Sequence, residues 1–443
     1  MNGATIAALA TPPGRGALAL IRISGRDAFG VAARVLDPFR AAPARVARRA
    51  GAHAVDGSAL DEVLYVAYAA PASYTGEDAV EITTHGGVLV PAEVLAACLV
   101  AGARSAEPGE FTRRALLNGK LDLVQAEATG DLVAATAPAQ RRAALHQLDR
   151  GLSDRIAALR EAVLQVEALL AYDIDFPEED DGPVAPERVA AALAALAADL
   201  ESLLATAGDG ERLHTGALCV IAGAPNVGKS SLFNALLGRD RALVTDEAGT
   251  TRDAIEADVT CDGFPFRLVD TAGLRAGGDR IERMGIEVSH RYLGAADVVL
   301  YCVAPDGAIA QEFLEQLVVP VLVVRTKADR EKQKAHGARE IDVSAVTGVG
   351  LPELRGRLAE LAFQGLVAGG DPGPMITRAR HRHALERALA EVHAFEAARR
   401  DGLEAAVAAT HLRVAVGALE DVIGVVAPEE ILDRLFAGFC VGK

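Results

Sequence analysis

The chain has 443 residues, of which 51 % are hydrophobic and 24 % are charged, and its 45 basic and 61 acidic residues give a formal net charge of −16. This length predicts two to four domains at roughly 150 residues each, the composition is typical of globular chains, and the acidic balance excludes nucleic-acid binding by broad electrostatics alone. The five cysteines are scattered and form no Cys-x-x-Cys pair. No uncharged apolar run reaches the roughly 18 residues that a membrane span needs, and no signal peptide is visible. These features predict a cytoplasmic protein without a membrane segment.

The first part of the chain, residues 1–117, has the pattern of an α/β domain. Apolar residues alternate in three short stretches separated by Gly and Pro, which predicts half-buried strands at Ala17–Ile23, Val63–Ala69 and Ala79–Thr83. Residues 118–215 become helical. An alanine-rich stretch there carries larger apolar residues at spacings of four and three, namely Val189, Leu193, Leu196, Leu200 and Leu203. The proline-rich residues 176–186 predict a loop within this helical part.

Residues 216–366 alternate between short apolar runs and helical sequence, which predicts a mainly parallel sheet covered by helices. The expected strands are Ala217–Ala222, Phe264–Val269, Val298–Val303 and Val318–Arg325. Residues 367–443 return to helix, with expected helices at 378–399, 403–420 and 429–436. We therefore expect an α/β plus all-α protein in which the unit 216–366 is inserted into one helical domain made of two chain segments. Two separate helical domains are the alternative.

The segment Gly223-Ala-Pro-Asn-Val-Gly228-Lys229-Ser230 matches the phosphate-loop pattern in full. It follows a predicted strand and opens the predicted helix Ser231–Leu237, which is the context that the pattern requires. In such a loop, backbone N–H groups face the phosphates at a helix N-terminus. Lys229 can then reach the β- and γ-phosphates, and the Ser230 hydroxyl can hold Mg²⁺. A glycine-rich turn without a ligand is the weaker interpretation.

Two further segments follow in the order that a GTPase needs. Gly249–Asp253 is the candidate first switch, in which Thr251 would be the second Mg²⁺ ligand. At the end of a predicted strand, Asp270 can orient Mg²⁺ through water, and the amide of Gly273 can sense the γ-phosphate. Leu274 stands where Ras-like enzymes have the Gln that positions water, so we expect another group to assist hydrolysis.

A candidate base motif, residues 326–329 (Thr-Lys-Ala-Asp), ends another predicted strand. The Asp329 carboxylate can accept both N–H groups on the Watson–Crick edge of guanine, and Ser344-Ala345 would close the base pocket. This motif usually begins with Asn. Because Thr326 offers one hydroxyl in place of an amide, we expect weaker guanine affinity and tighter GTP binding in Thr326→Asn.

Together these motifs predict a Ras-like guanine nucleotide hydrolase domain. Its candidate GTP-binding residues are Asn226, Val227, Gly228, Lys229, Ser230, Ser231, Thr245, Thr250, Thr251, Asp270, Gly273, Thr326, Lys327, Asp329, Ser344 and Ala345. A ribosome-assembly or translation GTPase, which is a binding switch without chemistry on RNA, shares this unit and is the first alternative function.

Several strings outside the nucleotide-binding unit form a recognisable set. They are Thr11-Pro-Pro-Gly-Arg-Gly16, Arg22-Ile-Ser-Gly25, Thr75-Gly-Glu-Asp78, Glu81, His85-Gly-Gly87, Pro108-Gly-Glu-Phe111, Asn118-Gly-Lys-Leu-Asp122 and Phe439-Cys-Val-Gly-Lys443. With these strings, the chain resembles from end to end the MnmE (TrmE) family of tRNA-modification GTPases. The phosphate loop alone indicates only a GTPase, and the N-terminal strings with the terminal Cys-x-Gly-Lys make the resemblance specific.

The resemblance implies an N-terminal domain, 1–117, that binds a tetrahydrofolate and forms a homodimer, a helical domain from 118–215 and 367–443, and a GTPase domain at 216–366. It implies addition of a carboxymethylaminomethyl or aminomethyl group to C5 of the wobble uridine, U34, in certain tRNAs. The one-carbon unit would come from 5,10-methylenetetrahydrofolate, of which 5-formyltetrahydrofolate is an analogue. The partner would be MnmG, which uses FAD and NADH, in a heterotetrameric complex that contacts tRNA largely through MnmG. A folate-dependent aminomethyltransferase that uses GTP only for regulation is the second alternative.

Carried over by position, the resemblance implies folate contacts from Arg22, Glu81, Lys120 and Lys443. Arg and Lys can pair with the glutamyl tail of a folate, and Glu can accept hydrogen bonds from the pterin edge. Without the resemblance, each of these residues would be taken as an ordinary surface residue. The role of Cys440 stays open, because no base lies near it in the sequence.

The missing Gln also predicts that another positive charge stabilises the transition state of hydrolysis. Hard oxygen ligands suited to a monovalent cation are available, and the resemblance identifies the cation as K⁺. Its implied ligands are the side chain of Asn226 and the carbonyls of Thr245, Glu247 and Thr250. The resemblance also implies that Glu282, on the helical segment Asp279–Glu287, is the general base once two GTPase domains meet. From the sequence alone, Glu282 would be an exposed helix acid.

Overall fold

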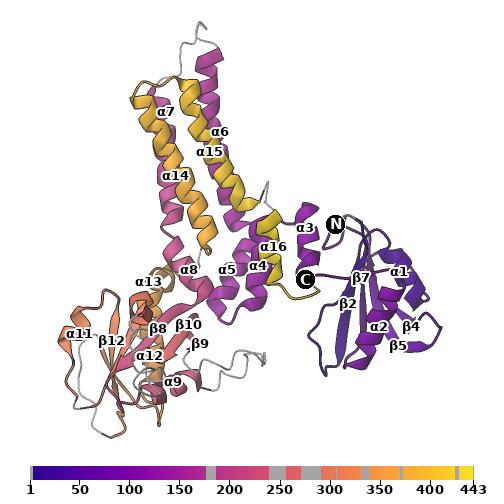
Figure 1. Ribbon diagram of the computed structural model, residues 1–443, viewed down its shortest axis with the longest axis horizontal. Helices are drawn as coiled ribbons and strands as arrows, with labels where there is room; N and C mark the ends of the chain where they lie inside the picture. Colours follow the sequence, from indigo (N-terminus) through magenta and orange to yellow (C-terminus); the bar gives the residue numbers. More distant parts are fainter. Residues whose placement is uncertain are drawn as a thin grey trace, which may run out of the picture. The chain divides into compact units, whose positions relative to one another are not determined.

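The computed structural model describes residues 3–175, 186–238, 256–270, 291–305, 307–330, 339–369, 373–424 and 429–442. Contacts divide the chain into two compact units, Met1–Gly130 with Glu420–Lys443 and Asp131–Leu419 (Figure 1). The division into three domains stays a prediction. Some candidate residues lie outside the described residues, namely Thr245, Glu247, Thr250, Thr251, Gly273, Glu282 and Lys443.

The first unit is built on a seven-stranded sheet in the order β3-β4-β5-β6-β2-β1-β7. Neighbouring strands are antiparallel except for β1 and β7, which are parallel. The strands are β1 (Ile6–Leu9), β2 (Leu18–Ser24), β3 (Leu36–Asp37), β4 (Arg48–His53), β5 (Ala59–Tyr68), β6 (Ala79–His85) and β7 (Arg104–Ser105). The helices of this unit include α1 (Ala28–Val35), α2 (Leu89–Val100), α3 (Glu110–Leu117) and α16 (Glu429–Ala437).

Strand β2 shows why the sequence pattern predicted this sheet. Ile21 and Ile23 are fully buried in one core with Val31 of α1 and Val94 of α2. Arg22, between the two isoleucines, is half-buried on the opposite face because side chains alternate along a strand. The alternation therefore covers one face of the sheet with helices and leaves Arg22 on the other.

The end of the chain belongs to this first unit. Val441 forms an antiparallel bridge with Pro108, and the amide of Gly109 donates to the carbonyl of Cys440 at 3.3 Å. Helix α16 packs through Leu432 and Phe436 against the start of α4 (Leu123–Ala134). The last residues thus complete the unit that the first residues begin.

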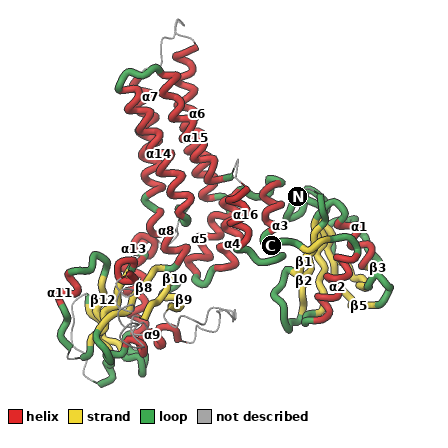
Figure 2. The backbone as a smooth tube through the Cα atoms, viewed as in Figure 1, coloured by secondary structure: helices red, strands yellow, loops and turns green. Residues whose placement is uncertain are grey.

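The second unit contains a long helical bundle (Figure 2). Its helices are α6 (Gly151–Asp175), α7 (Pro186–Leu204), α14 (Ala379–Arg400) and α15 (Ala405–Ile423), with the shorter α5 (Pro138–Leu148) and α8 (Ala207–Thr215) near the sheet. Adjacent bundle helices are joined by polar contacts. His411 of α15 lies 2.6 Å from Glu391 of α14, and Arg155 of α6 donates to Asp199 of α7 at 2.8 Å.

One described helical stretch, Glu187–Thr215, is long and apolar enough to cross a membrane by length and composition alone. The four leucines of the predicted stripe are between 0 and 4 % exposed, namely Leu193, Leu196, Leu200 and Leu203. Asp199 on the same stretch pairs with Arg155 of α6. The packing of the bundle therefore accounts for these four leucines.

The second unit also holds a six-stranded sheet in the order β13-β12-β11-β8-β10-β9. All neighbours are parallel except β9 and β10, which form an antiparallel hairpin. The strands are β8 (Ala217–Gly223), β9 (Glu256–Cys261), β10 (Phe264–Asp270), β11 (Val298–Val303), β12 (Val321–Thr326) and β13 (Glu340–Val343). The expected mainly parallel sheet is confirmed.

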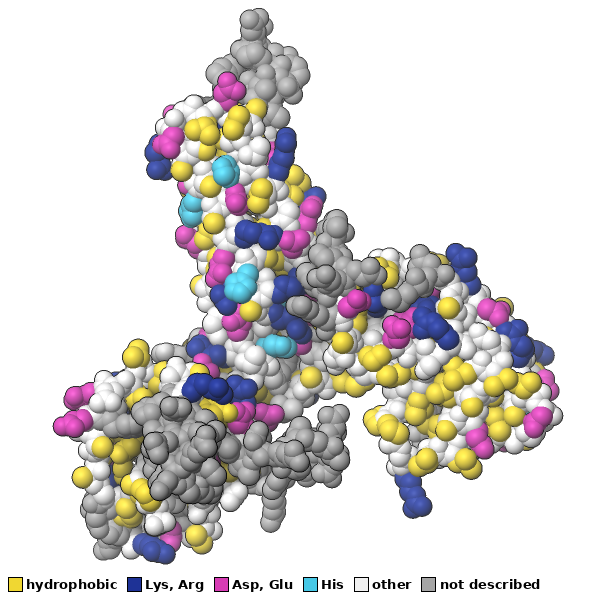
Figure 3. Space-filling view, in the orientation of Figure 1, with side chains coloured by type: hydrophobic (Ala, Val, Ile, Leu, Met, Phe, Trp, Pro, Cys, Tyr) yellow, Lys and Arg dark blue, Asp and Glu magenta, His cyan; other side chains and the backbone are white. Residues whose placement is uncertain are grey.

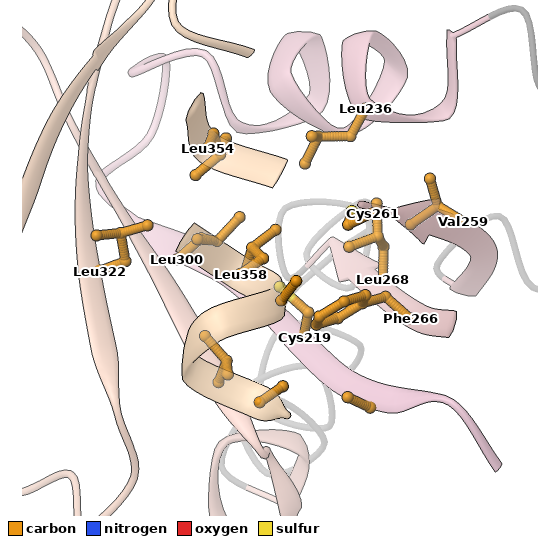
Figure 4. Close-up of a cluster of buried hydrophobic side chains, with 14 of the residues drawn as sticks. Cys219, Leu236, Val259, Cys261, Phe266, Leu268, Leu300, Leu322, Leu354 and Leu358 are labelled. Atoms are coloured by element: carbon orange, nitrogen blue, oxygen red, sulfur yellow. The ribbon is translucent and has the colours of Figure 1, made fainter. Parts of the chain in front are cut away.

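One face of this sheet is covered by α9 (Lys229–Leu237) and α12 (Leu351–Ala362), and Figure 4 shows the cluster between them. Leu236 comes from α9, Leu354 and Leu358 from α12, and all three are fully buried. The opposite face carries a second cluster that includes Val220 and Val299. Burial on both faces is the reason why β8 and β11 read as continuous apolar runs.

In the first unit, a buried ion network ties α3 to the sheet. The side chain of Glu110 is 7 % exposed and accepts hydrogen bonds from Arg104 and Arg114, each at 2.8 Å, and from the amide of Glu107 at 3.0 Å. Arg114 also pairs with Glu77 at 2.9 Å. Burial by itself would raise the pKa of Glu110, but these hydrogen bonds outweigh it and lower the pKa to about 2.

We expect Glu110→Gln to destabilise the first unit by about 3 kcal/mol at pH 7, because a pKa drop from 4.5 to about 2 corresponds to that free energy. A depressed pKa in the folded state stabilises the fold above pH 4.5, and this contribution is lost as the pH falls towards 2. Native-state hydrogen exchange of β2 and β6 amides should therefore show the variant approaching the wild type over that range. Glu62→Gln, in the exposed pair with Arg49, is the control and should change little. A difference that stays constant between pH 5 and pH 2.5 would contradict the network.

Candidate functional site

The parallel strands of the second sheet bring the nucleotide motifs to one edge. Gly223 at the end of β8 pairs with Cys302 of β11, and Asp270 at the end of β10 pairs with Ile221 of β8. Thr326 ends β12, the strand beyond β11. Ligands bind outside the carboxyl ends of the strands in open α/β sheets.

The phosphate loop connects β8 to α9 with backbone conformations that need glycine. Gly223 has φ +140°, and a Cβ there would lie 2.3 Å from the carbonyl oxygen of Cys302. Gly228 has φ +103° and forms the N-terminal cap of α9. The adjoining hydroxyls of Ser230 and Ser231 are exposed at this helix N-terminus, which is where an anion and its Mg²⁺ are expected.

Two buried charged side chains stand at the edge of the sheet where the loop begins. Lys229 is 7 % exposed and its Nζ donates to the carbonyls of Gly223 at 3.0 Å and Ala224 at 2.8 Å. Asp270 is 4 % exposed and ends β10, which pairs with β8. The parallel pairing therefore places the predicted lysine and the predicted acid at the same edge of the sheet.

The base motif is tied to the phosphate loop by two bonds that the sequence did not reveal. The buried Thr326 hydroxyl lies within hydrogen-bond distance of the carbonyls of Val227 and Val303. Lys327, at φ +60°, donates from Nζ to the carbonyl of Asn226 at 3.0 Å. The side chain of Thr326 is therefore used within the protein to position the loop. The predicted effect of Thr326→Asn on GTP affinity stays a prediction, and this substitution also replaces the bond to Val227.

The predicted base-recognising carboxylate is exposed and oriented. The Ser344 hydroxyl donates to Asp329 at 2.6 Å and itself accepts from the amide of Thr347 at 3.2 Å. The Ser344 hydrogen bond lowers the pKa of Asp329, so the acid is ionised and able to accept two donors. Ala345 follows Ser344 directly and is half-buried beside it.

The candidate folate residues are partly brought together on the open face of the first sheet. Arg22 and Glu81 are cross-strand partners, joined at 2.8 Å and 3.0 Å. Tyr68 donates to the second oxygen of Glu81 at 3.1 Å. The Arg22 guanidinium also donates to the carbonyl of Gly442 at 3.2 Å, which brings the residue before Lys443 to this pair.

Two aromatic rings lie near Arg22, and their place beside it could not be predicted from the sequence. The guanidinium carbon of Arg22 lies 5.6 Å from the centroids of both Tyr74 and Phe111. Lys120 donates to the carbonyl of Pro71 at 3.1 Å, on the loop that also carries Tyr74. Such a site suits a planar heterocycle with an anionic tail. The rings can stack on the heterocycle, the carboxylate can accept from its N–H edge, and the cations can pair with the tail.

The phosphate loop follows the central parallel strand β8, Asp270 ends the adjacent strand β10, and the oriented Asp329 follows β12. This arrangement defines a phosphate-loop GTPase domain. Two sequence profiles also match the chain, "GTP-binding protein TrmE N-terminus" over residues 5–120 and "MnmE helical domain" over residues 123–440.

Relatives match over nearly the whole length. A "tRNA modification GTPase MnmE" of Moorella thermoacetica is 42 % identical over 99 % of both chains. Its counterpart in Methylorubrum populi is 45 % identical over 99 % of this chain and 98 % of its own. Among solved structures, the G domain of the T. maritima FeoB iron transporter is 30 % identical and covers 33 % of this chain and 98 % of its own, with a TM-score of 0.26. The chain belongs to the MnmE family.

We expect Asp329→Asn to shift nucleotide preference from guanine towards xanthine, because xanthine replaces a donor of the guanine edge with an acceptor. Losing the matched bonds should weaken GTP binding by about 2–4 kcal/mol. Titration with fluorescent GDP, GTP and XTP checks this expectation. Asp342→Asn, on the neighbouring strand β13, is the control. Unchanged GTP affinity in Asp329→Asn would remove Asp329 from the base pocket.

Proposed function

We propose that this protein hydrolyses GTP in the modification of tRNA, at C5 of the wobble uridine U34. The observation that carries the proposal is the placement of Lys229, Asp270 and Asp329 at one sheet edge, after β8, β10 and β12, in a chain whose relatives are tRNA modification GTPases along their full length. A ribosome-assembly switch has no use for the ring-lined Arg22–Glu81 site, so it is the less favoured function.

Mass spectrometry of wobble nucleosides from a deletion strain tests this function. Complementation with the wild type should restore 5-substituted uridines, and complementation with Asp329→Asn should not restore them. Unchanged 5-substituted uridines in the deletion strain would contradict the proposal and would favour the ribosome-assembly function instead.

The residues at the phosphate loop fit a magnesium nucleotide. Ser230 presents an exposed hydroxyl at the N-terminus of α9, and Asp270 ends the adjacent strand. Hydroxyl and carboxylate oxygens are the ligands that Mg²⁺ prefers. The ion bound with GTP would neutralise charge on the phosphates. Thr251, as the second ligand, and the amide of Gly273, as γ-phosphate sensor, are part of this proposal.

For hydrolysis itself, we infer that the loop binds a second, monovalent cation and that a carboxylate of this chain acts as the base. Asn226 is exposed within the phosphate loop and has φ +62°, a left-handed conformation that Asn tolerates better than most residues. Its oxygen, with carbonyls of Thr245, Glu247 and Thr250, would hold K⁺ beside the phosphates. Glu282 would orient the attacking water when two GTPase domains meet.

This arrangement predicts hydrolysis that depends on the identity of the monovalent cation. The GTPase rate should rise strongly in KCl but not in NaCl, by up to roughly 10³-fold if K⁺ replaces an arginine finger. Glu282→Ala should lose turnover while nucleotide binding survives, and Glu287→Ala is the matched control on the same segment. Equal rates in the two salts would exclude the cation, and normal turnover in Glu282→Ala would exclude that base.

We further propose that the open face of the first sheet binds 5,10-methylenetetrahydrofolate. Glu81 and the rings of Tyr74 and Phe111 suit the pterin, and the cations Arg22 and Lys120 suit the glutamyl tail. Lys443 would complete the site, since Gly442 already contacts Arg22. The cofactor supplies a one-carbon unit when bound, and the residues of this chain bind and orient it.

We expect Arg22→Gln to weaken binding of 5-formyltetrahydrofolate to the full chain by roughly 10- to 100-fold, because a charge-assisted hydrogen bond is worth about 1.5–3 kcal/mol. Isothermal titration measures the effect. Arg49→Gln, on the same sheet in an exposed pair with Glu62, should bind as the wild type does. Removal of Lys443 should also weaken binding, and full affinity after its removal would take it out of the site.

The proposed partners are a second copy of this chain, MnmG and tRNA. Apolar side chains gather on the visible surface of the first unit (Figure 3). Several large ones are more than half exposed, namely Leu18, Leu64, Val88, Leu89 and Val100. An apolar surface of this kind is typical of subunit contacts and supports the homodimer. The net charge of −16 supports a division of labour in which MnmG contributes most of the tRNA contact.

A further inference from the structure

Helix α5 contacts the hairpin that carries the nucleotide-sensing segments. The amide of Ala139 donates to the carbonyl of Gly263 in the β9–β10 turn at 3.0 Å. The hydroxyl of Thr260 on β9 donates to the carbonyl of Thr136, just before α5, at 3.2 Å. One end of the hairpin is thereby fixed to the helical part of the second unit.

The opposite end of the same hairpin borders the candidate switches. Strand β9 begins at Glu256, five residues after Thr251, and β10 ends at Asp270, three residues before Gly273. A paired strand is stiff along its length, so a displacement at the nucleotide end reaches the turn. The hairpin therefore connects the nucleotide to α5 by continuous backbone pairing.

Packing makes this contact firm. Ala139 and Ala143 of α5 are buried in the same core as Phe264 and Phe266 of β10. Small alanine side chains let the helix approach the strand closely. The rings of Phe264 and Phe363 stack with centroids 4.8 Å apart behind this contact. The shared core makes α5 and β10 move together.

Helix α5 also holds the strand that enters the phosphate loop. Gln140 donates to the carbonyl of His214 at 3.3 Å, and its own oxygen accepts from the amides of Thr136 and Ala137. His214 stands at the end of α8, directly before β8. A single side chain thus links the start of α5 to the end of α8, which leads into the first residue of β8.

Another side of α5 borders open space. A cavity of about 70 Å³ is lined by Gln140, Ala144 and Gln147 of α5, with Asp131 and His214 opposite. Gln147 is 3 % exposed, donates to Thr377 at 2.9 Å, and its carbonyl oxygen has no hydrogen-bond partner among the described residues. The free volume on this side leaves room for a small shift of α5, and the bond from Gln147 to Thr377 joins this side of the helix to the segment that leads into α14.

We propose that α5 is the coupling element between the nucleotide site and the helical bundle: GTP and GDP set different positions of the β9–β10 hairpin, and α5 follows by moving relative to the cavity. The inference rests on the proposed GTPase function. Because coupling is reciprocal, a change that fixes α5 must alter the relative affinity for GTP and GDP.

Hydrogen exchange of the full-length protein tests the proposal, with GDP or a non-hydrolysable GTP analogue bound. Exchange of α5 amides should differ between the two nucleotides in the wild type. Thr260→Val, which removes the hydroxyl donor to Thr136, should reduce this difference at least twofold. Thr410→Val removes a hydroxyl that donates to the carbonyl of Val407 within α15, and it should leave the difference unchanged.

A second variant fixes the helix from its other side. Ala144→Val places two methyl groups in the cavity, and it should change the ratio of the dissociation constants for GDP and the GTP analogue by about fivefold or more. Ala390→Val, at an exposed position of α14, should not change this ratio.

Equal α5 exchange in the two nucleotides, in a wild-type protein that hydrolyses GTP, would overturn the coupling and leave the proposed function intact. Absence of GTP hydrolysis by the wild type would instead overturn the proposed function. An unchanged affinity ratio in a folded Ala144→Val protein would also overturn the coupling.

Discussion

The nucleotide site depends on the parallel pairing of β8 with β10 on one side and β11 on the other. In a parallel sheet, all carboxyl ends meet at one edge, so groups far apart in the chain converge without long loops. Gly223 can approach the carbonyl of Cys302 only because it lacks a Cβ, and this close approach brings the phosphate loop against the neighbouring strand. Shifting the pairing of β8 with β10 by one residue would turn the Asp270 side chain to the opposite face of the sheet.

Strand and helix periodicity predicted most of the described elements of the second unit, because continuous apolar runs such as Val298–Val303 leave few alternatives. It did not predict β9 or β13. These strands are short, and Glu256–Cys261 and Glu340–Val343 mix charged with apolar residues at the sheet edges, where burial imposes less pattern. Edge strands are defined by backbone pairing, which the sequence does not display.

Some residues of the candidate sites could likewise be predicted from the sequence, and others could not. Motif spacing predicted Lys229, Asp270 and Asp329, because each follows a strand of the sheet. The ties from Thr326 and Lys327 to the phosphate loop could not be predicted, since they use backbone carbonyls that every residue has. Arg22 and Glu81 were named only through family resemblance, and their cross-strand register explains why they stand together.

The bridge between Pro108 and Val441 sets a condition on how the protein is made. The first unit joins residues near 108 to residues near 441, so the surroundings of Arg22 cannot be complete until Gly442 has been translated. At about 5–20 residues per second, the synthesis that separates Phe111 from Gly442 takes roughly 15 to 70 s. During this interval the nascent first sheet lacks α16 and the bond from Arg22 to Gly442. The face of the sheet that carries Arg22 is therefore assembled in two stages separated by the synthesis of the second unit.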